Sequence, residues 1–160
     1  MNKINKILNH DLFIECYKKI ERCEENREFC HHDMAHFLDV ARLASIFNER
    51  YHLGIYKELI YGTALLHDIG RFIQYEDGTP HEIASAKIAP SILRDCGYSE
   101  KEISYIIEAI KNHRNVKVMD QDTLSGIIYR ADKMSRSCFA CKAEKKCDWK
   151  EDKKNLHLQW

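Results

Sequence analysis

The spacing of the apolar residues constrains the fold most, because it follows the helical repeat through most of the chain. Helices are predicted over residues 4–25, 32–50, 56–69, 80–97 and 99–113, with a further helix starting near residue 122. No segment alternates apolar and polar residues over the length of a strand, and only 6 glycines and 2 prolines occur among the 160 residues. The sequence therefore predicts an all-α fold, a bundle of helices.

Several residues predict where these helices begin and end. Ser99 and Glu102 form a capping box, in which each side chain bonds the other residue's backbone N–H. Gly70 is expected to end the helix that starts at residue 56, and residues 74–79 are expected to form a polar loop. Pro90 is expected to kink or split the following helix, because proline removes one helical hydrogen bond.

Length and charge limit the general class of protein. The length fits one domain. We expect a helical domain over 1–136, with its core at 30–136, followed by a cysteine-containing extension over 137–160. The 25 basic and 25 acidic residues cancel, so nothing indicates a nucleic-acid or membrane partner. Without a signal-peptide stretch or a long apolar run, a cytoplasmic protein is expected, and its oligomeric state stays open.

Four of the predicted helices carry a histidine or aspartate on, or at the end of, an apolar face. These residues are His36, the pair His67 and Asp68, His113, and Asp132. A lone histidine in such a place is more often a hydrogen-bonded core residue, and Asp132 has Lys133 nearby as an ion-pair partner. A buried Asp68 at a helix C-terminus, however, opposes the helix dipole and favours a nearby cation. The combination therefore predicts a site for Zn, Fe, Mn or Ni.

Three segments resemble the HD-domain phosphohydrolases. Residues 64–71 (ALLHDIGR) match the signature that gives that family its name. Residues 36–44 (HFLDVARLA) are similar to its first-histidine helix, and residues 130–133 (RADK) resemble its closing aspartate motif. The resemblance spans residues 30–136, and the order, context and spacing of the motifs make it specific.

The resemblance implies an HD-type helical bundle with the metal between core helices. The first metal would have four ligands: His36, His67, Asp68 and Asp132. In binuclear relatives extra histidines hold a second metal, and the aspartate of the pair bridges both. His81 and His113 lie where those extras would be, so two divalent ions are expected, although His81 could instead be a surface residue at a helix start. Arg114 stands where some binuclear relatives carry a second adjacent histidine.

The resemblance also implies hydrolysis of a small phosphoester or phosphoanhydride, with a nucleotide as the expected substrate. Bound metal would activate water and polarise a phosphoryl oxygen, with Asp68 at the reacting centre. Cationic side chains should neutralise the phosphoryl oxygens. The candidates for substrate binding are Arg71, Lys133 and Arg114, and Arg71 and Lys133 are also candidate catalytic residues. Each of these three could equally be a solvated surface charge.

Two other classes of function stay open. The same scaffold and ligand pattern serves di-iron oxygenases that resemble inositol oxygenase, which use O2 to break a C–C or C–P bond. A metal-binding regulatory module without turnover is the third class. The intact ligand set and Arg71 favour an enzyme over that module.

A cluster of cysteines follows the last predicted helix. Cys138, Cys141 and Cys147 have spacing that suits a separate Zn or iron–sulfur site, and Cys30 could supply a fourth ligand, with Cys96 and His157 as other options. The alternative is a surface loop with reduced thiols. Adjacent lysines would make such thiols reactive, as in a redox sensor.

The remaining cysteines and histidines are given ordinary roles. Cys16, Cys23 and Cys30 recur every seven residues, which predicts one face of a helix. Five histidines are expected at the surface or around the ligands: His10, His31, His32, His52 and His157.

Overall fold

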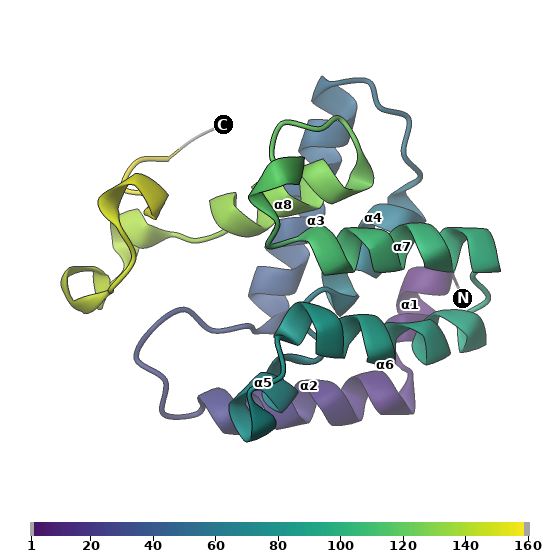
Figure 1. The fold of residues 1–160 in the computed structure, drawn as a ribbon, viewed down its shortest axis with the longest axis horizontal. Helices are drawn as coiled ribbons and strands as arrows, with labels where there is room; N and C mark the ends of the chain where they lie inside the picture. Colours follow the sequence, from purple (N-terminus) through teal and green to yellow (C-terminus); the bar gives the residue numbers. More distant parts are fainter. Residues whose placement is uncertain (1, 159–160) are drawn as a thin grey trace.

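The computed structural model describes residues 2–158, which form eight α-helices and four short 3₁₀ turns without a strand in that range (Figure 1). The helices are α1 (Lys3–Leu8), α2 (Asp11–Glu24), α3 (Met34–Arg50), α4 (Lys57–Leu66), α5 (Arg71–Asp77), α6 (His81–Asp95), α7 (Glu100–Asn112) and α8 (Leu124–Met134). The 3₁₀ turns are η1 (Val116–Val118), η2 (Cys138–Ala140), η3 (Glu144–Lys146) and η4 (Glu151–Lys153). The all-α prediction is confirmed.

The helices pack around one apolar core. Helix α3 contacts α4 and α8, α7 contacts α6 and α8, and α5 links α2 to α6. Figure 1 shows α3, α4, α7 and α8 on one side of the bundle and α2, α5 and α6 on the other. The largest fully buried side chains come from both groups, among them Phe37, Ile60, Leu65, Ile92 and Ile106. This packing brings together chain segments that are up to a hundred residues apart.

Local sequence signals start three of the helices, and one of these signals, the capping box, was predicted. The capping box is present, since the Ser99 N–H donates to Glu102 Oε2 at 2.7 Å and Ser99 Oγ accepts from the Glu102 N–H. Asp33 caps α3 by accepting from the His36 N–H at 2.8 Å, and Thr123 caps α8. The cap at Asp33 therefore fixes the start of the turn that carries His36.

Two predicted helix boundaries were wrong. The helix predicted over residues 4–25 is broken after Leu8, because His10 Nδ1 accepts the Leu12 N–H and starts α2 as a new helix. The helix predicted to reach Gly70 ends at Leu66, and α5 follows at once through most of the predicted polar loop. The reason is tertiary packing, since the partly polar α5 is held between α2 and α6.

Pro90 does not split its helix, which excludes one of the two outcomes expected for it. Helix α6 is continuous across Pro90, because contacts with α5 on one side and α7 on the other compensate for one missing N–H donor. The predicted cysteine face is also wrong. Cys16 is buried, Cys23 is exposed, and Cys30 lies beyond the end of α2, so the three do not share one helix face.

The segment after α8 lies beside the helical body (Figure 1). Its 3₁₀ turns are fastened by Asn155 Nδ2, which donates to the carbonyls of Lys133 at 2.7 Å and Arg136 at 2.9 Å. Lys146 Nζ also reaches Glu28 Oε1 at 2.6 Å in the loop between α2 and α3. No described helix has both the length and the apolar character needed to cross a lipid bilayer.

Candidate metal centre

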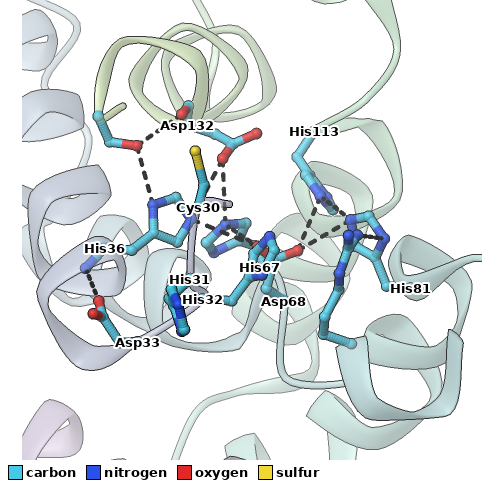
Figure 2. Close-up of polar contacts among 12 residues, drawn as sticks. Cys30, His31, His32, Asp33, His36, His67, Asp68, His81, His113 and Asp132 are labelled. Atoms are coloured by element: carbon cyan, nitrogen blue, oxygen red, sulfur yellow. Dashed lines mark hydrogen bonds and ion pairs between the residues drawn. The ribbon is translucent and has the colours of Figure 1, made fainter. Parts of the chain in front are cut away.

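Six predicted ligands converge from five places in the bundle. His36 lies in the first turn of α3, His67 and Asp68 lie in the turn after α4, and Asp132 lies in the last part of α8. His81 is the first residue of α6, and His113 caps the C-terminus of α7. All six side chains are buried, and Figure 2 shows them pointing toward one another.

The first group consists of His36, His67, Asp68 and Asp132, whose ligand atoms all lie within 4.8 Å of one another. Asp132 Oδ1 is 3.5 Å from His36 Nε2 and 3.8 Å from His67 Nε2. Asp68 Oδ2 is 3.1 Å from His67 Nε2 and 3.6 Å from His36 Nε2. Two imidazoles and two carboxylates thus enclose one position.

The second group consists of Asp68, His81 and His113. Asp68 Oδ1 is 3.1 Å from His81 Nε2 and 3.5 Å from His113 Nε2, and the two histidine nitrogens are 3.1 Å apart. Asp68 therefore faces the first group with Oδ2 and the second group with Oδ1. Figure 2 shows this arrangement, with His36 and Asp132 on one side of Asp68 and His81 and His113 on the other.

The outer nitrogen of each histidine is held by a hydrogen bond away from the centre. His67 Nδ1 donates to the Ala64 carbonyl at 2.7 Å, and His113 Nδ1 donates to the Ile110 carbonyl at 2.6 Å. Because a carbonyl only accepts, each Nδ1 carries a proton, and in the neutral ring each Nε2 presents a lone pair to the centre. Bonds of this kind orient metal-binding histidines.

His36 and His81 are oriented in the same sense by side chains. Ser135 Oγ donates its own proton to the Asp132 carbonyl at 2.8 Å and accepts from His36 Nδ1 at 3.0 Å. Gln74 Oε1 lies 2.6 Å from His81 Nδ1. These contacts leave the Nε2 atoms of both rings directed at Asp68 and its neighbours.

The residues fit a divalent cation because the centre contains polar atoms that nothing in the described chain satisfies. His67 Nε2 and Asp68 Oδ1 are fully enclosed, and neither has a hydrogen-bond partner among residues 2–158. Leaving such atoms unpaired is costly, and nitrogen and carboxylate oxygen are ordinary ligands of transition metals. The His/Asp cluster therefore fits a divalent-metal site.

The charges in the centre are strongly coupled. Burial opposes the ionisation of Asp68 and Asp132, yet the surrounding histidines, with Lys133 beside Asp132, hold the pKa of both carboxyls well below the usual range. Burial also disfavours a charge on His67, but the two carboxylates raise its pKa to about 10. His36 is affected differently, because burial dominates and lowers its pKa to about 4. The centre thus carries two anionic carboxylates that require cationic partners.

Two of the three predicted cations touch the centre. Arg71 Nη1 is 2.7 Å from His81 Nδ1, and Lys133 Nζ is 2.6 Å from Asp132 Oδ2. Arg114 is half exposed and pairs with Glu82 at 3.4 Å instead of with a ligand. It therefore lies farther from the centre than Arg71 and Lys133. The structure thus brings Arg71 and Lys133 to the ligands, while Arg114 lies beyond them.

Sequence reasoning missed Arg136 at this centre. Arg136 Nη2 is 3.3 Å from His36 Nε2 and 3.9 Å from Asp132 Oδ1, and its side chain is 10% exposed. The signal was present, because positions i and i+4 of a helical turn share one face and Arg136 follows Asp132 by four. Arg136 and Ser135 also line a groove of about 250 Å³ that runs along α3 and the C-terminal segment.

His32 and Glu24 form a second feature that was only partly foreseen. His32 is buried, its Nδ1 is 2.5 Å from Glu24 Oε1, and its Nε2 is 3.8 Å from Asp68 Oδ2. The Tyr75 hydroxyl also donates to Glu24 at 2.6 Å. His32 lies two residues before α3, although a helix was predicted from residue 32, so the loop before α3 brings it next to the ligands.

Gly70 permits the close approach of α6 to the turn that carries His67 and Asp68. A Cβ atom at Gly70 would lie 2.4 Å from the Ser85 backbone nitrogen and 2.7 Å from Ala84 Cβ. The Gly70 N–H also donates to Ser85 Oγ at 2.9 Å. The absent side chain therefore sets the spacing between the pair and the helix that begins at His81.

The predicted cysteine cluster is brought together at a separate place. Cys30, Cys138, Cys141 and Cys147 line one small cavity. Cys96 is instead buried in the apolar core, and His157 lines the groove beside Arg136. Of the three candidates for a fourth ligand, Cys30 is therefore the one that lies with Cys138, Cys141 and Cys147.

Comparison with known proteins finds related sequences. The sequence model of the HD domain family matches residues 34–137. An uncharacterized protein of Clostridium beijerinckii is 44% identical over 160 residues and the full length of both chains. Ribonuclease Y of Mycoplasma mycoides is 29% identical over 137 residues, which are 86% of this chain and 30% of that protein.

A solved structure shares the fold. The crystal structure of a predicted HD superfamily hydrolase from an uncultured Thermotogales bacterium has a TM-score of 0.63 and 20% sequence identity, covering 89% of this chain and 81% of that chain. The family match spans well over half of the chain and includes all six clustered side chains from His36 to Asp132, with His81 and His113 among them. This chain belongs to the HD domain family.

Proposed function

We propose that this chain is a metal-dependent phosphohydrolase that acts on a nucleotide or another small phosphoester or phosphoanhydride. The observation that carries the proposal is the position of Asp68, whose two oxygens face two different groups of ligands. A carboxylate in that position can bridge two cations. We therefore propose two ions of Fe, Mn, Ni or Zn, one in each group.

Bound cations would supply Lewis-acid polarisation of a phosphoryl oxygen and would lower the pKa of a water ligand. In the reaction, the oxygen of water bonds to phosphorus, the bond to the leaving oxygen breaks, and a proton passes to that leaving oxygen. No side-chain nucleophile is required. The buried ligands hold the reacting groups in a site from which bulk water is largely excluded.

In this proposal three cations of the chain would neutralise phosphoryl oxygens. Lys133 and Arg136 flank the first group of ligands, and Arg71 flanks the second. When the proton of His81 is on Nδ1, that nitrogen donates to Gln74 Oε1, and Arg71 is then free to donate to the substrate. Arginine can bind two phosphoryl oxygens at once, which favours Arg71 and Arg136 as substrate-binding residues. Arg114 is a more distant candidate.

The names of relatives agree with phosphorus–oxygen bond cleavage. Several relatives are named ribonuclease Y, which indicates phosphodiester hydrolysis in those proteins. The chain spans less than a third of their length, so the substrate can differ in size and class. A screen should therefore include phosphodiesters, phosphomonoesters and dinucleoside polyphosphates.

The test is metal stoichiometry combined with activity. Protein is stripped with chelator, reloaded with Mn²⁺ or Fe²⁺, and analysed for bound ions and for phosphate release. The wild type should bind two ions at the centre, His113→Ala should keep one, and Asp68→Asn should lose both along with activity. Asp122→Asn is the matched control, because Asp122 is exposed and lies outside both groups.

Full phosphatase activity in Asp68→Asn would remove the proposal. Equal metal content in all four proteins would also contradict it. A reloaded di-iron protein that consumes O2 and hydrolyses no phosphorus–oxygen bond would instead identify an oxygenase. Metal binding with no turnover of either kind would identify a regulatory module.

A further inference from the structure

Four cysteines from two distant segments meet at the edge of the helical body. Cys30 belongs to the loop between α2 and α3, whereas Cys138, Cys141 and Cys147 belong to the segment after α8. All four line one cavity of about 20 Å³, which is the size needed for a single water molecule or ion. All four are free thiols and are half-buried.

Polar contacts hold the two segments against each other around this cavity. Lys146 pairs with Glu28, and Arg136 Nη1 donates to the His31 carbonyl at 3.0 Å. Inside the C-terminal segment, Lys154 Nζ donates to the Glu144 carbonyl and carboxylate at 2.9 Å. These contacts fix the backbone that carries the cysteines.

The C-terminal segment has little apolar burial to order it. Ten of the thirteen residues from 142 to 154 are charged, and Ala143 is the one buried apolar residue among described positions 137–158. Exposed ion pairs contribute little to stability, and a segment of this composition does not usually order itself. The structure nevertheless folds it into three consecutive turns, η2, η3 and η4. A cross-link at the cysteines would account for that order.

We propose that Cys30, Cys138, Cys141 and Cys147 bind one Zn²⁺ as four thiolates, at a structural site separate from the His/Asp centre. The spacing of Cys138 and Cys141 is the two-residue interval typical of zinc ligands, and four sulfur ligands make a closed tetrahedral site. The small cavity accepts a single ion rather than a multi-iron cluster. Binding releases the thiol protons to solvent, and no redox change is involved.

The electrostatics around Cys30 favour its neutral thiol, so a bound cation is needed to hold it as a thiolate. Burial raises the pKa of the Cys30 thiol, Arg136 lowers it, and the three neighbouring cysteines raise it again. Four thiolates at this distance repel one another unless a cation lies between them. The thiols have to draw closer on binding, because the groups within residues 2–158 whose ligand atoms all lie within 4.8 Å contain no cysteine.

The position of this site gives it a structural role next to the His/Asp centre. Arg136 bonds the His31 carbonyl one residue after Cys30, and it also approaches His36. The zinc would therefore fasten the segment that follows Asp132 to the loop that precedes α3. The other three cysteines do not share this position, since Cys16 and Cys96 lie in the core and Cys23 is exposed on α2.

The first experiment uses the wild-type chain. The protein is stripped of metal, loaded with cadmium-113 and studied by NMR, because cadmium bound by four thiolates resonates far downfield of cadmium bound by nitrogen and oxygen. We expect one strongly deshielded resonance per chain, in addition to any signal from the His/Asp centre. Absence of a resonance in the thiolate range would overturn the proposal.

The second experiment uses variants. Cys138→Ser with Cys141→Ser should bind one zinc ion fewer per chain than the wild type and should melt at a lower temperature, while the ions at the His/Asp centre remain. Cys23→Ser is the matched control and should keep the full zinc content. Zinc content unchanged in the double variant, a disulfide among the four thiols, or labile sulfide with a visible iron–sulfur spectrum would each refute the zinc site.

Discussion

Ser135 offers a sharp test of how the metal ligands are oriented. Its hydroxyl donates to the Asp132 carbonyl at 2.8 Å, so the bond with His36 Nδ1 at 3.0 Å has to be donated by the histidine. Replacing Ser135 with alanine removes the acceptor and leaves the imidazole free to turn. The ring also becomes a weaker ligand, because the bond to Nδ1 increases the basicity of Nε2.

The expected magnitude follows from one lost orienting hydrogen bond. Loss of such a bond weakens metal affinity by about 10- to 100-fold, which corresponds to about 1.4 to 2.7 kcal/mol. The effect should be confined to the ion held by His36, since His81 and His113 make no contact with Ser135. Affinity at the second group should therefore stay within about a factor of two, because no orienting bond is lost there.

Titration calorimetry of Mn²⁺ into chelator-treated protein would measure both affinities. Ser135→Thr retains a hydroxyl and should restore binding, and Ser137→Ala is the control because Ser137 is exposed two residues further along the chain. Unchanged affinity in Ser135→Ala would refute the assignment of His36 as an oriented ligand. An equal loss in Ser137→Ala would point to a general effect on the C-terminal segment instead.

Two further predictions concern the residues around the ligands. Gly70→Ala should lower the free energy of unfolding in urea by about 3 kcal/mol or more, because the new Cβ would clash with the backbone at Ser85 and with Ala84. The φ of Gly70, −89°, is itself unstrained for alanine. A loss below about 1 kcal/mol would contradict the close approach. Burial would raise the pKa of Glu24, but hydrogen bonds from His32 and Tyr75 lower it to about 2. The Glu24 carboxylate therefore stabilises the fold above pH 4.5, and this contribution is lost as the pH falls from 4.5 toward 2. The stability difference between wild type and Glu24→Gln should therefore shrink by about 2 to 3 kcal/mol between pH 6 and pH 2, and a difference independent of pH would refute the assignment.

The sequence predicted the helices where the signals are local. The capping box at Ser99 and Glu102 started α7 as expected, because both partners lie within one turn of each other. The split considered at Pro90 and the loop expected at the polar residues 74–77 did not occur, for the opposite reason. Both lie in helices that are held by neighbours distant in sequence, and those contacts outweigh local preferences.

Residue type and position in the chain also pointed to the six clustered side chains. The sequence could indicate that five of them lie on, or at the end of, apolar helix faces, and the resemblance to HD-domain proteins added His81 and related all six to one another. The sequence could not show that Asp68 divides its oxygens between two groups, since that depends on how α6 and α7 approach the turn after α4. It gave no reason to connect Glu24 with this centre, and it left His32 either at the surface or around the ligands.

By itself, then, the sequence determined the helical class, the main capping signals, the family resemblance and the chemical nature of the ligands. These depend on local periodicity and on short motifs. The tertiary structure decided that Arg136 lies beside the ligands while Arg114 lies beyond them, and that Cys30, among the candidates for a fourth ligand, joins three cysteines more than a hundred residues away. Such contacts arise from the packing of whole helices and loops, and no short stretch of sequence carries that information.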